Sequence, residues 1–443
     1  MKIVFAFFLG FVVYFVADSL FTPLQAQLLG AVTFLVVLWT NNGLPLGVVS
    51  LLPILLFPAL GIVPLNEVTP NYAKSIIFLF IGGFMLAIAM QKTGLHEQIS
   101  SRLLRVFPHS ARGVVYAMAV VSALLSSILS NTTITMMLLP VALFLSEERR
   151  LKTRILLAVA YGASIGGILT PIGTPPNLLL LGFLDQMGLQ GPTFGEWTVM
   201  MLPIAVPMLL IMPWILTIGV AKEPVGKRDE KIPPLSPSQK KLAIILMGLT
   251  LLLLLNTPFK PWYPGLGLNE KGLLLAAGLL LFLPGVNLLD WEDSRSIPWE
   301  IIFLFGAGFS IAQAFGSTHL AEALAHKLAF VTHLPLFAAL LVVALFISFS
   351  TEITSNTALT AIALPVMAQL YGPDNPVTLL ILMTATVAAS YAFMLPIATP
   401  PNAIVVSARV IKISTMAMYG FIIDLIGVVA VALSAYLIWR WMV

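Results

Sequence analysis

Apolar residues run in long, nearly uninterrupted stretches from one end of the chain to the other. Such runs stand, for example, at 3–16, 27–40, 76–90, 200–220, 242–255, 272–283 and 421–439. A helix of about 20 apolar residues crosses the hydrocarbon core of a bilayer. A transmembrane β-barrel would instead show segments of about ten residues with alternating polarity, and the sequence shows none. The pattern therefore predicts an all-α polytopic protein embedded in the lipid bilayer.

The start of the chain admits a second interpretation, because Lys2 precedes the apolar run 3–16 as in a signal peptide. No A-x-A cleavage site follows, and further apolar runs come at once. We therefore expect this segment to be a first transmembrane helix.

The amino-acid composition excludes several classes of protein and of site. Of the 443 residues, 59% are hydrophobic and 9% are charged, whereas soluble domains carry about 25% charged residues. The absence of cysteine excludes disulfides, thiolate metal sites and cysteine nucleophiles. We interpret the net charge of +4 as a topology signal, and we expect no nucleic-acid partner.

The chain contains an internal duplication. The triplet Ser-Asn-Thr occurs at 130–132 and again at 355–357, a separation of 225 residues. The same separation relates ILTPIGTPPN (168–177) to FMLPIATPPN (393–402), and FLFIGGFML (78–86) to FLFGAGFSI (303–311). We place the two halves at roughly 23–221 and 248–443, with one extra helix in front.

The distribution of Lys and Arg predicts opposite orientations for the two halves. The polar, proline-rich linker carries Lys222, Lys227, Arg228, Lys231, Lys240 and Lys241, and we expect it to be cytoplasmic. Basic clusters also flank 113–146 on both sides: Arg102, Arg105 and Arg112 before it, and Arg149, Arg150, Lys152 and Arg154 after it. The matching loop of the second half, 372–376, has no basic residue. This contrast is typical of inverted-topology repeats.

Each triplet should lie at the tip of a re-entrant hairpin. Because both ends of 113–146 carry basic clusters, both should be cytoplasmic, which makes 112–148 a hairpin with Ser-Asn-Thr near its tip. By symmetry, 335–371 is a hairpin that enters from outside. Irregular backbone at membrane depth is tolerated only inside protein or beside a wet cavity.

The two TPPN stretches predict broken helices, because consecutive prolines remove backbone donors. Breaks at matching positions in both halves are typical of a transporter binding site. A channel would not need them. An enzyme would need a nucleophile with its base or a metal cluster, and the motifs contain no HExxH, no paired aspartates and no nearby His. We therefore expect no enzyme.

The chemistry of the motifs suits an anion and a cation together. Hydroxyls and amides bind carboxylate oxygens, helix N-termini favour anions, and carbonyl and hydroxyl oxygens suit a hard cation. No Lys or Arg occurs in 113–148, 155–185 or 328–408. A divalent anion at membrane depth needs charge compensation, so we expect co-bound cations.

Several residues admit a less specific structural role. A single Ser-Asn-Thr is more often a helix-packing element, but its recurrence with TPPN favours a binding site. Gly82, Gly83, Gly306 and Gly308 are expected to serve close packing. Glu352 is either a proton site or a paired structural carboxylate, and we favour the structural role.

The paired triplets, each followed by a TPPN break, resemble the divalent-anion:sodium symporter family of di- and tricarboxylate transporters over nearly the whole chain. The resemblance implies about 11 transmembrane helices, a scaffold that forms a homodimer, and a transport domain that moves as an elevator. The implied segments are a scaffold at 1–94 and 242–317, an amphipathic cytoplasmic surface helix at 95–108, a transport domain at 110–221 and 333–443, a cytoplasmic linker at 222–241 and an external surface helix at 318–332.

The resemblance also implies the site residues. Substrate would be bound by Ser130, Asn131, Thr132, Ser355, Asn356, Thr357, Thr399 and Pro400. At least two Na⁺ ions would be held, one by Ser126, Ser130, Asn131 and Gly173, the other by Thr351, Thr354, Asn356 and Ala398. The breaks differ at one position, where Thr170 has Leu395 as its counterpart.

The expected function is sodium-coupled symport of a C4-dicarboxylate such as succinate, malate or fumarate into the cell, across the inner or plasma membrane. Sodium-independent dicarboxylate exchange and transport of citrate or sulfate on the same scaffold remain alternatives. Some relatives that exchange without sodium carry basic residues near the cation positions. This sequence has none there, which favours symport.

Overall fold

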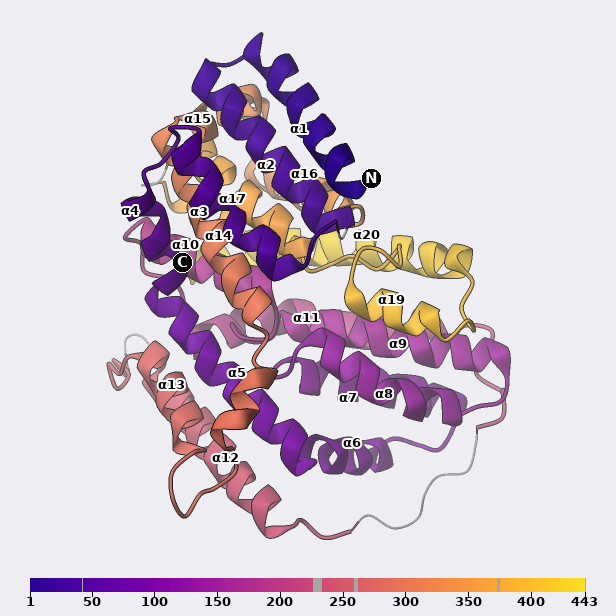
Figure 1. Ribbon diagram of the computed structural model, residues 1–443. Helices are drawn as coiled ribbons and strands as arrows, with labels where there is room; N and C mark the ends of the chain where they lie inside the picture. The colour runs from indigo at the N-terminus through magenta and orange to yellow at the C-terminus, as the bar shows by residue number, and fades with distance from the viewer. Residues whose placement is uncertain (42, 226–232, 259–261, 373–374, 443) are drawn as a thin grey trace.

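The computed structural model describes residues 1–41, 43–225, 233–258, 262–372 and 375–442, and within them it contains helices and no strands (Figure 1). Among these described residues, six helical stretches are long and apolar enough to cross a membrane: Pro23–Asn41, Leu65–Thr93, Phe194–Thr217, Pro237–Asn256, Trp299–Ser317 and Ile413–Trp441. The predicted all-α membrane fold is thereby confirmed. Lys227, Arg228 and Lys231 of the expected linker, and Pro373 and Asp374, lie outside the described residues.

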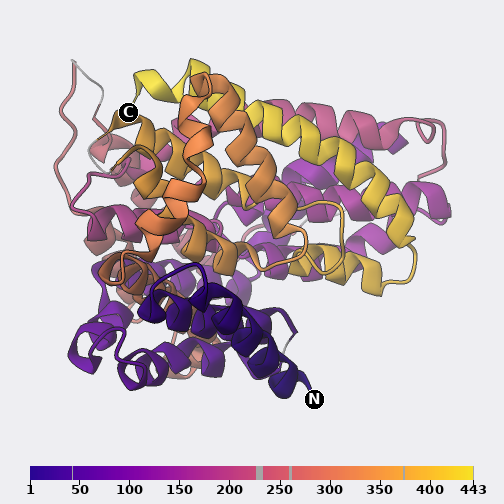
Figure 2. The ribbon, with the colours of Figure 1, turned by 90° about the horizontal axis from the view of Figure 1, so that it is seen from above.

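The first elements are α1 (Lys2–Asp18), α2 (Pro23–Asn41), α3 (Leu46–Ala59), the short α4 (Leu65–Val68) and η1 (Thr69–Ala73), then α5 (Ser75–Thr93) and α6 (Leu95–Val106). Helices α1 to α3 lie together at one edge of the molecule (Figures 1 and 2), whereas α5 leads away from them toward α6 at the opposite end of Figure 1. Helices α1 and α2 approach closely because glycines meet: a Cβ on Gly10 would lie 2.8 Å from the carbonyl oxygen of Gly30. The outer face of α1 exposes a row of phenylalanines, as expected of a surface in contact with lipid.

The next five helices contain the first triplet and the first break. They are α7 (Ala111–Ser126), α8 (Asn131–Phe144), α9 (Arg149–Gly167), α10 (Pro175–Gln186) and α11 (Phe194–Thr217). Helices α7 and α8 pack on each other and on α9, so the segment on either side of the triplet is a helical hairpin. This pair is called hairpin 1 below.

The second half repeats this order. Its elements are α12 (Pro237–Asn256), α13 (Glu270–Leu280), η2 (Trp291–Ser296), α14 (Trp299–Ser317), α15 (Leu320–Lys327), η3 (Ala329–His333), α16 (Leu336–Thr351), α17 (Asn356–Tyr371), α18 (Pro376–Ala388), α19 (Pro400–Ser407), α20 (Ile413–Leu437) and η4 (Trp439–Trp441). Helices α16 and α17 form a second hairpin around the second triplet, called hairpin 2.

Contacts between the halves occur in matched pairs. Helix α5 packs against α13, and their counterparts α14 and α3 also pack together. Helix α10 packs against α17, and their counterparts α19 and α8 do likewise. Reciprocal contacts of this kind are expected when two copies of one unit are related by an approximate two-fold axis.

The two hairpins nevertheless differ in their surroundings. In hairpin 2, α17 packs extensively against α14 and α15. The equivalent contacts of hairpin 1 would join α8 to α5 and α6, and neither is among the extensive contacts of the described chain. The halves therefore share one architecture but adopt different positions against the helices that surround them.

Close packing of α7 on α9 should depend on glycine. A Cβ on Gly166 would overlap the backbone of Ala123, whereas Gly248, inside α12, has open space beside it. We predict that Gly166→Ala lowers stability, since overpacking costs about 1–3 kcal/mol. Gly248→Ala should stabilise by about 0.5–1 kcal/mol through helix propensity. Thermal unfolding in detergent measures both, and equal effects of the two variants would contradict the packing described here.

Candidate functional site

The tip of hairpin 1 brings together several of the expected site residues. Ser130 is the N-cap of α8, where its Oγ accepts a hydrogen bond from the Thr133 backbone N–H at 3.2 Å and lies 2.8 Å from Thr133 Oγ1. The Ser126 hydroxyl donates to Asn131 Oδ1 at 2.5 Å. Thus Ser126 and Asn131 meet directly across the turn, while the hydroxyl of Ser130 is engaged in capping.

The tip of hairpin 2 repeats the central contact. The Thr351 hydroxyl donates to Asn356 Oδ1 at 2.6 Å, with the carbonyl oxygen of Ala389 at 3.1 Å. Ser355, unlike Ser130, makes no side-chain cap hydrogen bond. The Thr354 hydroxyl donates to the carbonyl of Ser350 at 2.8 Å, so this hydroxyl is turned into its own helix and away from Asn356.

An asparagine clamps each helix break. Asn177 Nδ2 donates to the carbonyls of Gly167 at 3.1 Å and Thr170 at 2.9 Å. Asn402 Nδ2 donates to Ala392 and Leu395, both at 3.0 Å. Both side chains are fully buried. The sequence predicts no role for these two residues, although the final Asn of TPPN recurs in both halves and is the signal that could have identified them.

A different chemistry joins each hairpin tip to the neighbouring break. In the first half, the Thr170 hydroxyl donates to the carbonyl of Ser127. In the second, Glu352 occupies the equivalent of Ser127, and its carboxylate accepts the backbone N–H groups of Met394 and Leu395, each at 2.8 Å. Because Glu352 makes this link in the second half, Leu395 needs no hydroxyl at the position that corresponds to Thr170. These contacts are what the structural role favoured for Glu352 requires.

The first break presses against the first tip. A Cβ on Gly167 would lie 2.9 Å from Asn131 Oδ1, and a Cβ on Gly173 would lie 2.5 Å from the carbonyl oxygen of Gly167. Glycine is therefore required at position 173, where a Cβ would meet backbone, and it lets the chain approach Asn131 at position 167. The neutral oxygens of Ser126 and Asn131 thus lie beside the backbone of the first break.

The remaining expected residues lie along the second break and the hairpin helices. Thr399, which is 5% exposed, caps α19 by accepting the Asn402 backbone N–H at 3.3 Å. Ala398 and Thr357 are buried, Thr132 is half-buried and Pro400 is exposed. Helices α8, α10, α17 and α19 all begin at or beside these motifs, so four helix N-termini carry partial positive charge there.

A small cavity of about 40 Å³ adjoins the first tip. Ser130 and Gly173 line one side, and aromatic side chains Phe80 and Phe84 of α5 and Phe305 of α14 line the other. None of the residues that line it is charged. The first tip thus faces the α5–α14 helices through an apolar wall that offers no fixed charge to an anion.

The donor set restricts the kind of metal that could bind. Within the described ranges, no group of three or more His, Asp or Glu side chains is placed to hold a metal. Hydroxyl, amide and carbonyl oxygens without thiolate or imidazole suit hard cations and not transition metals. The neutral oxygens around Asn131 and Asn356 therefore suit a hard cation.

Comparison with known proteins identifies a family and several relatives of this chain. Residues 34–388 match the model of a family described as citrate transporter. The sodium-dependent dicarboxylate transporter SdcS of Staphylococcus saprophyticus is 31% identical over 431 residues, which cover 90% of this chain and 83% of the relative. A Staphylococcus aureus protein of the same name is 29% identical over 432 residues, with the same coverage of each chain.

The chain belongs to the citrate transporter family of divalent-anion:sodium symporters. The family resemblance expected from the two triplets is thereby confirmed. Members of this family are transporters and not enzymes, and the chain is a multi-pass plasma membrane protein.

Solved structures of other transporters share the fold. The YdaH transporter of Alcanivorax borkumensis superposes with a TM-score of 0.56 at 16% identity, covering 83% of this chain and 86% of its own. MtrF of Neisseria gonorrhoeae, from a class of antimetabolite efflux pumps, gives 0.57 at 16% identity, covering 85% and 84%. At 16% identity, this similarity shows a shared fold and nothing more specific.

The asparagine clamps predict an isosteric test. In Asn402→Asp, a carboxylate oxygen replaces the amide nitrogen and faces two carbonyl oxygens, so both hydrogen bonds are lost. Each buried acceptor left unpaired costs about 1–3 kcal/mol. We expect a clear fall in the unfolding midpoint in detergent, as also for Asn177→Asp. The control is Asn66→Asp on the surface of α4, and equal midpoints for Asn402→Asp and this control would contradict the assigned clamp.

Proposed function

We propose that this protein is a secondary active transporter that carries a C4-dicarboxylate into the cell together with sodium ions. The names of the Staphylococcus relatives, which cover 90% of this chain, support this substrate and coupling ion. The observation that carries the proposal is the repeated contact of hydroxyl with asparagine, Ser126 with Asn131 and Thr351 with Asn356, at two hairpin tips.

The absence of fixed positive charge supports coupling to a cation. No Lys or Arg occurs in 113–148, 155–185 or 328–408, the segments that contain the tips and most of the breaks. A dicarboxylate with two negative charges would be costly to hold there by hydroxyls and helix N-termini alone. Bound Na⁺ supplies the missing charge, so substrate affinity should depend on sodium.

Each group of residues then has a defined task. Two sodium ions bind at the first tip, with Ser126, Ser130, Asn131 and Gly173, and at the second, with Thr351, Thr354, Asn356 and Ala398. Because the Thr354 hydroxyl donates into its own helix, we assign only its backbone oxygen to the ion. The substrate carboxylates are bound by Ser130, Asn131, Thr132, Ser355, Asn356, Thr357, Thr399 and Pro400.

Alternating access follows from the duplication. We infer that the halves are inverted in the membrane, as their basic residues indicate. Hairpin 2 packs against α14 and α15, while hairpin 1 lacks the equivalent extensive contacts within the described chain. If hairpin 1 and hairpin 2 exchanged these surroundings, the transporter would open toward the opposite side of the membrane. In this motion the transport domain would move against the scaffold, with the transport domain at 110–221 and 333–443 and the scaffold at 1–94 and 242–317. The homodimer remains a prediction from the family resemblance.

The proposal is tested by removing one asparagine at a time. In Asn131→Ala or Asn356→Ala, one tip loses an oxygen that serves both ion and substrate. We expect initial uptake of labelled succinate by proteoliposomes to fall at least tenfold, and the sodium concentration for half-maximal rate to rise. Asn66→Ala, on the surface of α4, is the matched control. Unchanged uptake in both tip variants would refute the assignment.

A competition experiment with citrate tests the identity of the substrate, because the matching family model is described as citrate transporter. Unlabelled citrate, sulfate and malate are added to the succinate uptake assay. We expect malate to compete at concentrations near those of succinate and citrate to require at least tenfold more. Competition by citrate below the succinate concentration would make the protein a citrate transporter on the same site.

A further inference from the structure

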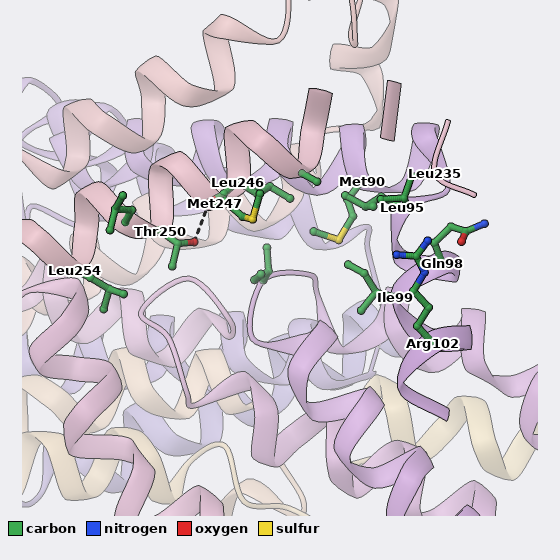
Figure 3. Close-up of a pocket in the computed structure, with 13 residues that line it drawn as sticks. Met90, Leu95, Gln98, Ile99, Arg102, Leu235, Leu246, Met247, Thr250 and Leu254 are labelled. Atoms are coloured by element: carbon green, nitrogen blue, oxygen red, sulfur yellow. Dashed lines mark hydrogen bonds between the residues drawn. The ribbon is translucent and has the colours of Figure 1, made fainter. Parts of the chain in front are cut away.

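A groove of about 490 Å³ lies outside the site described above, between α12, α6 and the tip of hairpin 1 (Figure 3). Its long wall is α12 from Ala243 to Leu254, a stretch of about 17 Å at 1.5 Å per residue. The opposite wall includes Met90 and Ile99, and Ile128 of the hairpin tip reaches it. Elements far apart in the sequence thus form one elongated surface.

Polar and apolar groups are separated along the groove. Figure 3 shows Gln98 and Arg102 together at one end, near Leu235, and Leu254 at the other. The only hydroxyl in the apolar part, that of Thr250, donates to the carbonyl of Leu246 in its own helix at 2.8 Å. The α12 wall therefore offers only apolar contacts to a molecule bound in the groove.

The polar end is suited to an anion that also carries a hydroxyl group. Arg102 is exposed and forms no ion pair with any residue that the structure describes. Gln98 Oε1 is buried and has no hydrogen-bond donor within the same residues. An arginine binds phosphate through charge-assisted hydrogen bonds, and a buried amide oxygen needs a donor such as a hydroxyl.

The groove is continuous with a surface that faces lipid. Ile244, Met247 and Leu251 of α12 are 65%, 65% and 57% exposed. A dicarboxylate would gain nothing from an apolar wall of this length, whereas an acyl chain gains about 0.8 kcal/mol for each buried CH₂ group. Arg102 lies on the amphipathic helix α6, at the height of a headgroup if that helix lies on the membrane surface.

We propose that the groove binds an anionic phospholipid of the phosphatidylglycerol type, with its phosphate at Arg102, a headgroup hydroxyl at Gln98 Oε1 and an acyl chain along α12. The lipid would come from the cytoplasmic leaflet, and only this assignment rests on the proposed function, through its membrane orientation. Ile128 lines this groove and also the small cavity that contains Ser130. The lipid chain therefore contacts the hairpin tip two residues before the substrate motif.

The test is native mass spectrometry of the purified full-length protein in detergent, titrated with phosphatidylglycerol or phosphatidylcholine of equal chain length. The wild type should bind phosphatidylglycerol at least tenfold more tightly than phosphatidylcholine. Arg102→Gln should abolish this preference, and Thr250→Trp, which fills the groove, should remove binding of both lipids. The matched controls are Arg105→Gln on the same helix and Ile244→Trp on the outer face of α12, and both should bind as the wild type does.

The contrary results are equally specific. Equal preference in the wild type and Arg102→Gln, or lipid binding that survives in Thr250→Trp, would overturn the proposal. Because lipid binding is measured in detergent, a wild type that binds phosphatidylglycerol but transports nothing would refute the proposed function and leave this inference supported.

Discussion

Backbone polar groups at membrane depth must find partners, and this requirement shapes the whole site. In the proposed topology, two hairpin tips and two helix breaks lie at membrane depth, where lipid offers no hydrogen-bond partners to their amides and carbonyls. The chain satisfies them with a few short side chains: Asn177 and Asn402 clamp the breaks, while Ser130 and Thr399 cap the helices that follow. The groups left over at the tips are hydroxyls and amide oxygens, which are the groups that an anion and a hard cation need.

The duplication explains why the site has two similar halves, and its imperfections are informative. The contact of Ser126 with Asn131 is repeated by Thr351 with Asn356. The link from tip to break is not repeated, because a hydroxyl on a carbonyl in one half is replaced by the Glu352 carboxylate on two backbone N–H groups in the other. The second tip therefore has a carboxyl group beside it at the position that Ser127 occupies in the first. The two proposed cation sites should therefore differ in affinity.

The sequence alone placed the helix interruptions well, because Ser-Asn-Thr and TPPN interrupt otherwise apolar runs and recur at one separation. Hydrophobic length and charge also suffice for the all-α membrane class. Contacts across many residues could not be predicted in this way. The binding of Glu352 to the backbone of Met394 and Leu395 depends on how the break folds back, and the inward turn of the Thr354 hydroxyl depends on a side-chain rotamer. The groove at α12 combines three segments that no local pattern connects.

The central claim is that sodium compensates the charge of the substrate at a site without fixed cations. The most direct test is uptake of labelled succinate into proteoliposomes that contain no internal dicarboxylate, with and without an inward sodium gradient. The account predicts accumulation only with the gradient, and none when potassium replaces sodium. Uptake that ignores sodium and appears only after dicarboxylate is loaded inside would establish an exchanger and contradict the account.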